Sequence, residues 1–76
     1  MEFQYITCNP KILGGKACIR GTRISVELIL EWIANGSTIE EICDEFDQLT
    51  HESVREAILY AGQRSRNEFF YEVKAA

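Results

Sequence analysis

The chain has 76 residues, of which 46% are hydrophobic and 26% are charged, and its formal net charge is −4. A chain this short forms one domain with a thin core, burying roughly 60% of the surface that its unfolded form exposes. The acidic total argues against non-specific nucleic-acid binding by the whole surface, although a basic patch could still bind locally. No apolar run approaches the ~18 residues of a membrane span, and no signal peptide is visible, so we expect a cytoplasmic protein without a membrane partner.

Basic and acidic residues are separated along the chain. Residues 1–23 carry four basic side chains against one acidic, whereas residues 24–56 carry one basic against nine acidic. Within the first part, residues 14–24 combine three glycines with three basic residues and no acidic one. The sequence therefore predicts a short basic head in front of an acidic body.

The head has the pattern of a small β-hairpin. Residues 3–7 alternate and are rich in strand-forming residues, and residues 17–20 form a second candidate strand. Asn9-Pro10 and Gly14-Gly15 are turn signals between the two. A turn or bulge is expected at Gly21, because glycine enters positive φ at little cost.

Three helices are predicted after the head. The first spans residues 26–34, between an N-cap at Ser25 and the stop signal Asn35-Gly36. The second spans residues 39–46 and is capped either by Ser37 with Glu40 or by Thr38 with Glu41. The third begins after Thr50 and runs from His51 to about Ser65.

The end of the chain is unusually apolar. Phe69, Phe70 and Tyr71 could pack on the domain, extend the third helix or meet another subunit. Three aromatic residues near one end form a candidate self-association surface, and we expect a homodimer.

A short helix, a four-residue link and a longer helix have the layout of a helix-turn-helix. The outward face of the third helix is predicted to hold one arginine, one histidine, two acids and a leucine: His51, Glu52, Arg55, Glu56 and Leu59. Major-groove readers favour Arg, Lys, Asn or Gln and avoid acids near phosphate. A structural helix-turn-helix is therefore favoured over a DNA-reading one.

The chain carries an ordered set of short motifs between about Ile6 and Arg64. They are Asn9-Pro10, Gly14-Gly15-Lys16, Ile19-Arg20-Gly21-Thr22-Arg23-Ile24, Gly36-Ser37-Thr38-Ile39-Glu40-Glu41-Ile42, Leu49-Thr50 and Val54-Arg55-Glu56-Ala57-Ile58. In this set the chain resembles the domain of unknown function family 433. The resemblance implies a homeodomain-like helical fold behind a small β element, in a bacterial or archaeal protein, and an antitoxin role against a PIN-like ribonuclease toxin. The chain departs from the family pattern at Ala17, Ser25 and Asp47, where proline is common.

The fold class we predict is mainly α. Residues 1–76 form a single domain, made of a β-hairpin-like head (1–24), a three-helix bundle with a helix-turn-helix (25–66) and an apolar tail (67–76).

The candidate contacts to a partner or to nucleic acid are Arg20, Thr22, Arg23, His51 and Arg55. Arg20 and Arg23 could grip phosphate or the acidic metal site of a toxin, but pairing with this chain's own acidic helices, or those of a twin subunit, is favoured. Thr22 is expected to satisfy backbone groups in a turn. A solvated side chain is favoured for His51, since no Ser, Cys or acid lies beside it in the sequence.

No cofactor, metal or catalytic residue is predicted. Cys8, Cys18 and Cys43 fit neither a disulfide framework nor a zinc pattern, and buried, reduced thiols are expected. The acids of the second helix lack the loop geometry of a cation site. The function expected first is a non-enzymatic regulatory protein, an antitoxin-like partner of a PIN-type ribonuclease. A dimeric helix-turn-helix DNA-binding regulator and a dimeric scaffold are the alternatives.

Overall fold

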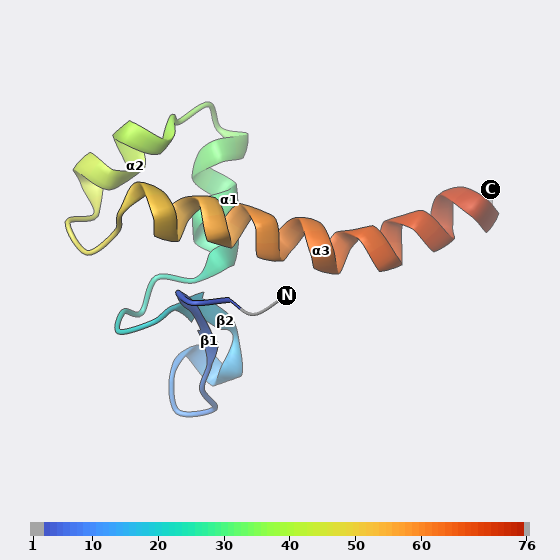
Figure 1. Cartoon of the computed structure of the whole chain (residues 1–76), viewed down its shortest axis with the longest axis horizontal. Helices are drawn as coiled ribbons and strands as arrows, with labels where there is room; N and C mark the ends of the chain where they lie inside the picture. The colour runs from blue at the N-terminus through green and yellow to red at the C-terminus, as the bar shows by residue number, and fades with distance from the viewer. Residues whose placement is uncertain (1–2, 76) are drawn as a thin grey trace.

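The computed structural model describes the backbone of residues 3–75 and the side chains of residues 3–65. Its elements are β1 (Ile6–Cys8), a 3₁₀ turn η1 (Leu13–Gly15), β2 (Ala17–Ile19), α1 (Val26–Ala34), α2 (Ile39–Glu45) and α3 (His51–Ala75), as Figure 1 shows. β1 and β2 pair antiparallel, with Ile6 opposite Ile19. The prediction of a mainly helical chain with a β-hairpin head is confirmed.

β1 begins later than predicted. The strand starts at Ile6 rather than at residue 3, because the N–H of Tyr5 donates to the carboxylate of Glu56 on α3 and not to a strand. The carbonyl of Tyr5 still accepts from the N–H of Arg20 across the hairpin at 2.7 Å. The head is thus joined to α3 at the point where it enters the hairpin.

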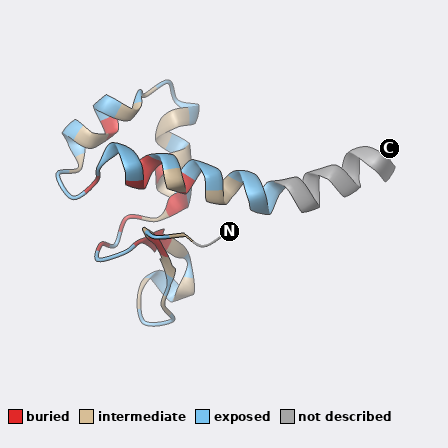
Figure 2. Cartoon of the chain, in the orientation of Figure 1, coloured by how far each residue is buried: buried red, intermediate tan, exposed pale blue. Residues whose placement is uncertain are grey.

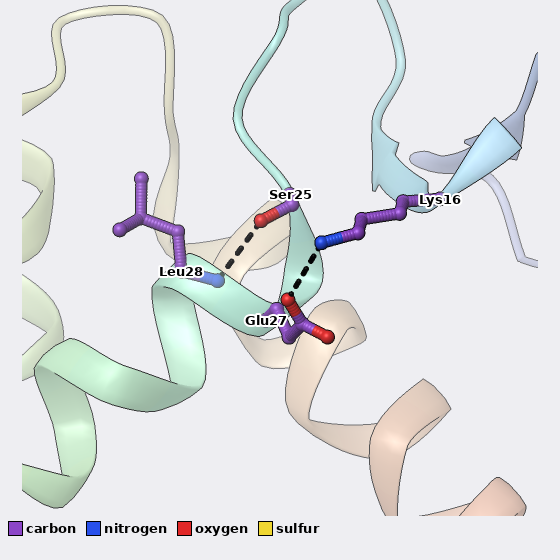
Figure 3. Close-up of polar contacts among 4 residues, drawn as sticks. All are labelled: Lys16, Ser25, Glu27 and Leu28. Atoms are coloured by element: carbon purple, nitrogen blue, oxygen red, sulfur yellow. Dashed lines mark hydrogen bonds and ion pairs between the residues drawn. The ribbon is translucent and has the colours of Figure 1, made fainter. Parts of the chain in front are cut away.

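α1 has the predicted bounds. The Ser25 hydroxyl accepts a hydrogen bond of 3.0 Å from the N–H of Leu28, which caps the helix (Figure 3). The Lys16 ammonium lies 3.1 Å from the Glu27 carboxylate in the first turn. Both of these side chains are more than 60% exposed, so the ion pair adds little to stability.

α2 uses the second of the two predicted caps. Thr38 and Glu41 form a capping box, in which the Thr38 hydroxyl accepts from the Glu41 N–H and the Glu41 carboxylate accepts from the Thr38 N–H. The helix ends at Glu45, one residue before the predicted end. Phe46 is its C-cap and packs edge-on against Trp32 at a ring distance of 5.4 Å.

α3 starts as predicted but ends much later. Thr50 and Ser53 exchange side-chain to backbone hydrogen bonds of 3.0 and 3.2 Å at its start. The helix continues to Ala75 instead of ending near Ser65, and Figure 1 shows its C-terminal part leaving the other elements behind. The predicted tail is therefore a helical extension. The side chains of Phe69, Phe70 and Tyr71 lie outside the described residues.

The core lies where the three helices meet and reaches down to the hairpin (Figure 2). Its buried hydrophobic members are Ile6, Ile19, Ile24, Val26, Ile29, Ile42, Leu49, Val54 and Ala57. They come from the head and from all three helices, so the hairpin is part of the same fold. Within the described residues, none of the helices combines the length and apolar character of a membrane span.

Replacing Ile42 by alanine is expected to lower the free energy of unfolding by about 2–5 kcal/mol, because the side chain is fully buried and leaves a cavity. Leu13→Ala is the control, since Leu13 is 37% exposed and its loss costs about 0.5 kcal/mol. Urea unfolding followed by circular dichroism measures both. Equal losses would contradict a core centred between α1, α2 and α3.

Candidate interaction site

The basic segment folds into a tight turn between β2 and α1. The N–H of Thr22 donates to the carbonyl of Ile19 at 3.0 Å, and the N–H of Ile19 donates to the carbonyl of Ile24 at 2.9 Å. Gly21 has φ +81°, as the third residue of a type II turn requires. The glycine of the Arg-Gly-Thr-Arg motif is therefore needed for backbone geometry.

The hydroxyl of Thr22 holds this turn together. It donates to the carbonyl of Ile19 at 2.8 Å and accepts from the N–H of Ile24 at 3.0 Å. The residue is only 9% exposed. Thr22 therefore satisfies backbone groups, as the turn interpretation predicted, and its side chain is not available to contact a partner.

Arg20 is also engaged within the chain, but not by carboxylates. Its guanidinium donates to the carbonyl of Gln4 at 3.1 Å and to that of Ile6 at 3.3 Å. The expected pairing with the chain's own acidic helices is therefore wrong for this residue. Arg20 binds backbone carbonyls because it follows β2 directly and lies opposite Tyr5, and Gln4 and Ile6 are the two neighbours of Tyr5 in the sequence.

Arg23 differs from Arg20. It is exposed, and no hydrogen bond or ion pair joins its guanidinium to another described residue. Its neighbours Thr22 and Ile24 are buried, so the backbone that carries it is held in place. The turn therefore fixes the backbone of Arg23 and leaves its guanidinium exposed to solvent.

The other predicted contact residues lie on α3. His51 and Arg55 are exposed and one helical turn apart. No hydrogen bond or ion pair within the described part of the chain connects either of them with Arg23. The predicted site is therefore split between the turn and the helix.

Glu56 does not belong to the outward face where it was predicted. It is half-buried and accepts the hydrogen bond from the Tyr5 N–H that joins α3 to the head. Spacing alone could not reveal this role, because the partner is a backbone group 51 positions away. Phe3 packs edge-on against Tyr60 of the same helix at 5.2 Å and strengthens this junction.

An open hollow of about 430 Å³ lies between the head, α1 and α3. Its apolar lining includes Ala17, Val26, Leu30 and Ala61, and its polar lining includes Lys16, Glu27 and Arg64. Arg64 also lies over the ring of Tyr60, 5.7 Å from the centroid. The sequence gave no signal for this hollow, which forms only when the head docks on the helices.

The three cysteines differ in exposure. Cys18 is fully buried, as predicted, but Cys43 is half-buried and Cys8 is exposed, so the prediction of buried thiols is wrong for Cys8. Cys8 shares a strand face with the buried Ile6 but lies at the hollow, beyond the cover of the helices. Among the side chains described here, no group of three or more His, Cys, Asp or Glu could hold a metal ion.

Burial raises the pKa of the Cys43 thiol above its ordinary value, and the negative charges of Asp44, Glu40 and Glu52 raise it further. The thiolate is the reactive form of cysteine. The surroundings of Cys43 therefore make it a poor nucleophile.

The fold and the turn define a small, mainly helical domain that carries a two-stranded head. The profile of a family described as a protein of unknown function (DUF433) matches residues 6–61. That match covers most of the chain and includes the whole hairpin, the turn and the part of α3 that packs on the core. The chain belongs to this family.

Two relatives support the assignment. An uncharacterised protein, y4eO, from Sinorhizobium fredii is 34% identical over 58 residues, which are 76% of this chain and 26% of that protein. The crystal structure of a DUF433 member from Anabaena variabilis matches with a TM-score of 0.77 at 30% identity, over 83% of this chain and 62% of the other. The chain thus spans about a quarter of the first relative and under two thirds of the second.

Replacing Thr22 by valine is expected to cost about 1–3 kcal/mol of folding free energy, because the buried Ile24 N–H loses its acceptor. Thr22→Ser keeps the hydroxyl and should lose clearly less. Urea unfolding of the two variants and the parent measures the difference. An unchanged midpoint for Thr22→Val would mean that the hydroxyl does not hold the turn.

Alkylation should distinguish the cysteines by position and by pH. Cys8 should react first with iodoacetamide and Cys18 last, following their exposure. The rate at Cys43 should rise only at a higher pH than for cysteine in an unstructured peptide, because its raised pKa keeps the thiol protonated. Peptide mass spectrometry after timed quenching measures the alkylation rate of each cysteine. A Cys43 rate that rises at the same pH as that of the unstructured peptide, or at a lower pH, would contradict the raised pKa.

Proposed function

We propose that this chain is a non-enzymatic interaction and regulatory protein, an antitoxin-like partner that binds and neutralises a PIN-type ribonuclease. The observation that carries the proposal is the exposed guanidinium of Arg23, which has no partner among the described residues and sits on a fixed turn. Arg20 and Thr22 are already engaged by backbone groups. Arg23 is therefore the residue of the motif that is left for a partner.

The chemistry of such a partner suits an arginine. PIN-like nucleases hold their metal with clustered carboxylates, and a guanidinium binds a carboxylate through two parallel hydrogen bonds. A turn that is ordered before binding loses little conformational freedom when it docks, which favours affinity. In this proposal the turn carries Arg23 into the acidic site and occupies it.

The features of α3 support a protein partner over DNA. Its exposed side chains include Ile58 and Leu59, which are apolar, and Glu52, which repels phosphate.

A dimeric helix-turn-helix regulator is the second candidate, with α2 and α3 as its two helices in a homeodomain-like arrangement. The observation that favours it is the exposure of His51 and Arg55 in the first two turns of α3. Recognition helices contact base edges with residues near their N-termini. A dimeric scaffold without either partner is the third candidate.

Arg23→Ala is expected to weaken binding to a PIN-like ribonuclease encoded beside this chain's gene by roughly 30-fold or more, as loss of a central arginine does at an interface. The fold should be unaffected, because Arg23 is exposed and no hydrogen bond or ion pair joins its side chain to another described residue. Lys11→Ala is the control, since Lys11 is exposed in the same head but outside the turn. Co-purification and calorimetric titration measure binding.

The outcome separates the three candidates. Failure of the parent chain to bind the ribonuclease at micromolar concentrations would overturn the antitoxin proposal. A gel shift on the DNA upstream of the gene, weakened by salt and by Arg55→Ala, would then support the regulator. Binding to neither would leave the scaffold.

A further inference from the structure

The outward face of α3 carries two exposed apolar side chains one helical turn before a glycine. Ile58 is 37% exposed and Leu59 is 52% exposed, and Gly62 follows one helical turn later. Apart from Leu13 in the head, these two are the exposed large hydrophobic residues of the described part of the chain. Neither belongs to the hydrophobic core or to the partly buried hydrophobic residues that pack against it.

Gly62 has no explanation within its own chain. It lies in the middle of a long helix, where glycine is less favourable than alanine. A Cβ built on it would meet nothing within 4 Å, and its φ is not in the left-handed region. Neither a close contact within the chain nor the backbone conformation explains why this position has no side chain. A second helix crossing at this point would explain it, because a glycine lets two helix axes approach closely.

We propose that the α3 helix of a second copy crosses this face antiparallel to the first, with the two-fold axis beside Gly62. Two-fold dimers bury the same surface on both copies. Positions equally far from the axis then meet, which brings Leu59 opposite Ser65 and Ile58 opposite Arg66. One turn further out, position 55 comes opposite position 69.

The charges select this direction. In the antiparallel pair, Arg55 and Arg66 on this face each come opposite an uncharged residue. A parallel pair would place Arg55 against Arg55 and Arg66 against Arg66, and such like-charge contacts oppose association. The face is therefore complementary to itself in one direction only.

The length of α3 leaves room for the second helix. The helix runs to Ala75, and in Figure 1 its C-terminal part lies away from the other elements. In the sequence, Phe69, Phe70 and Val73 follow Ile58 and Leu59 at helical spacing. This surface is separate from the turn that carries Arg23.

A substitution series at Gly62 tests the inference on the purified full chain. Native mass spectrometry and sedimentation should show a dimer at micromolar concentrations. Gly62→Ala should raise the thermal midpoint of the dilute, monomeric chain, because alanine is the better helix former, yet weaken dimerisation by about tenfold. Gly62→Leu should abolish the dimer while the helical circular dichroism signal is kept. Opposite effects on folding and on association are specific to a close helix crossing.

A matched pair of variants checks the position of the interface. Ile58→Gln should weaken the dimer by about tenfold or more, whereas Leu13→Gln, at the same exposed fraction of 37%, should not. Equal effects would indicate non-specific apolar association and overturn the proposal. A monomeric parent chain would overturn it too, since the face would then be covered by a different protein or by none. Ribonuclease binding through Arg23 is measured separately, so either result stands without the other.

Discussion

The hydrogen-bonded turn between β2 and α1 is the constraint on which the rest of the structure depends. The Thr22 hydroxyl and the positive φ of Gly21 reverse the chain within a few residues, which sets β2 beside the start of α1. Arg20, at the same turn, fastens β1 through two backbone carbonyls. The Tyr5 N–H then reaches Glu56 and joins this assembly to α3. Because a domain of this size has a thin core, each of these polar links carries a large share of the head's stability.

Fewer basic side chains of the head are free to bind a partner than its composition indicates. Lys16 forms an exposed ion pair with Glu27 and Arg20 is engaged by the main chain, so Arg23 is the cation of this segment that has no hydrogen-bond or ion-pair partner among the described residues. The apolar surface on α3 lies on a different element and needs no contribution from the head. If both proposals hold, one molecule can bind a partner and self-associate at the same time. A dimer formed through Ile58 and Leu59 would hold two Arg23 turns in a fixed relation, which would favour a partner that is itself two-fold symmetric.

Local signals predicted the elements well. Ser25, Thr38 and Thr50 are short-range capping residues, and each helix begins directly after one of them. The failures concern interactions between distant positions. The predicted end of α3 near Ser65 is wrong, because the helix continues to Ala75. The role of Glu56 depends on a backbone group in the head. The engagement of Arg20 by carbonyls could not be predicted from charge patterning, which considers only opposite charges as partners.

The position of the Arg20 guanidinium has a consequence for solubility. Successive carbonyls of an extended strand point to opposite sides, so the carbonyl of Ile6 lies on the side of β1 that faces away from β2. Unpaired acceptors on such an edge invite strands from other molecules and lead to aggregation. Arg20 donates to this carbonyl and to that of Gln4, just before the strand. One side chain thus fastens the hairpin and occupies an acceptor on its open edge, where a strand of another molecule would otherwise pair.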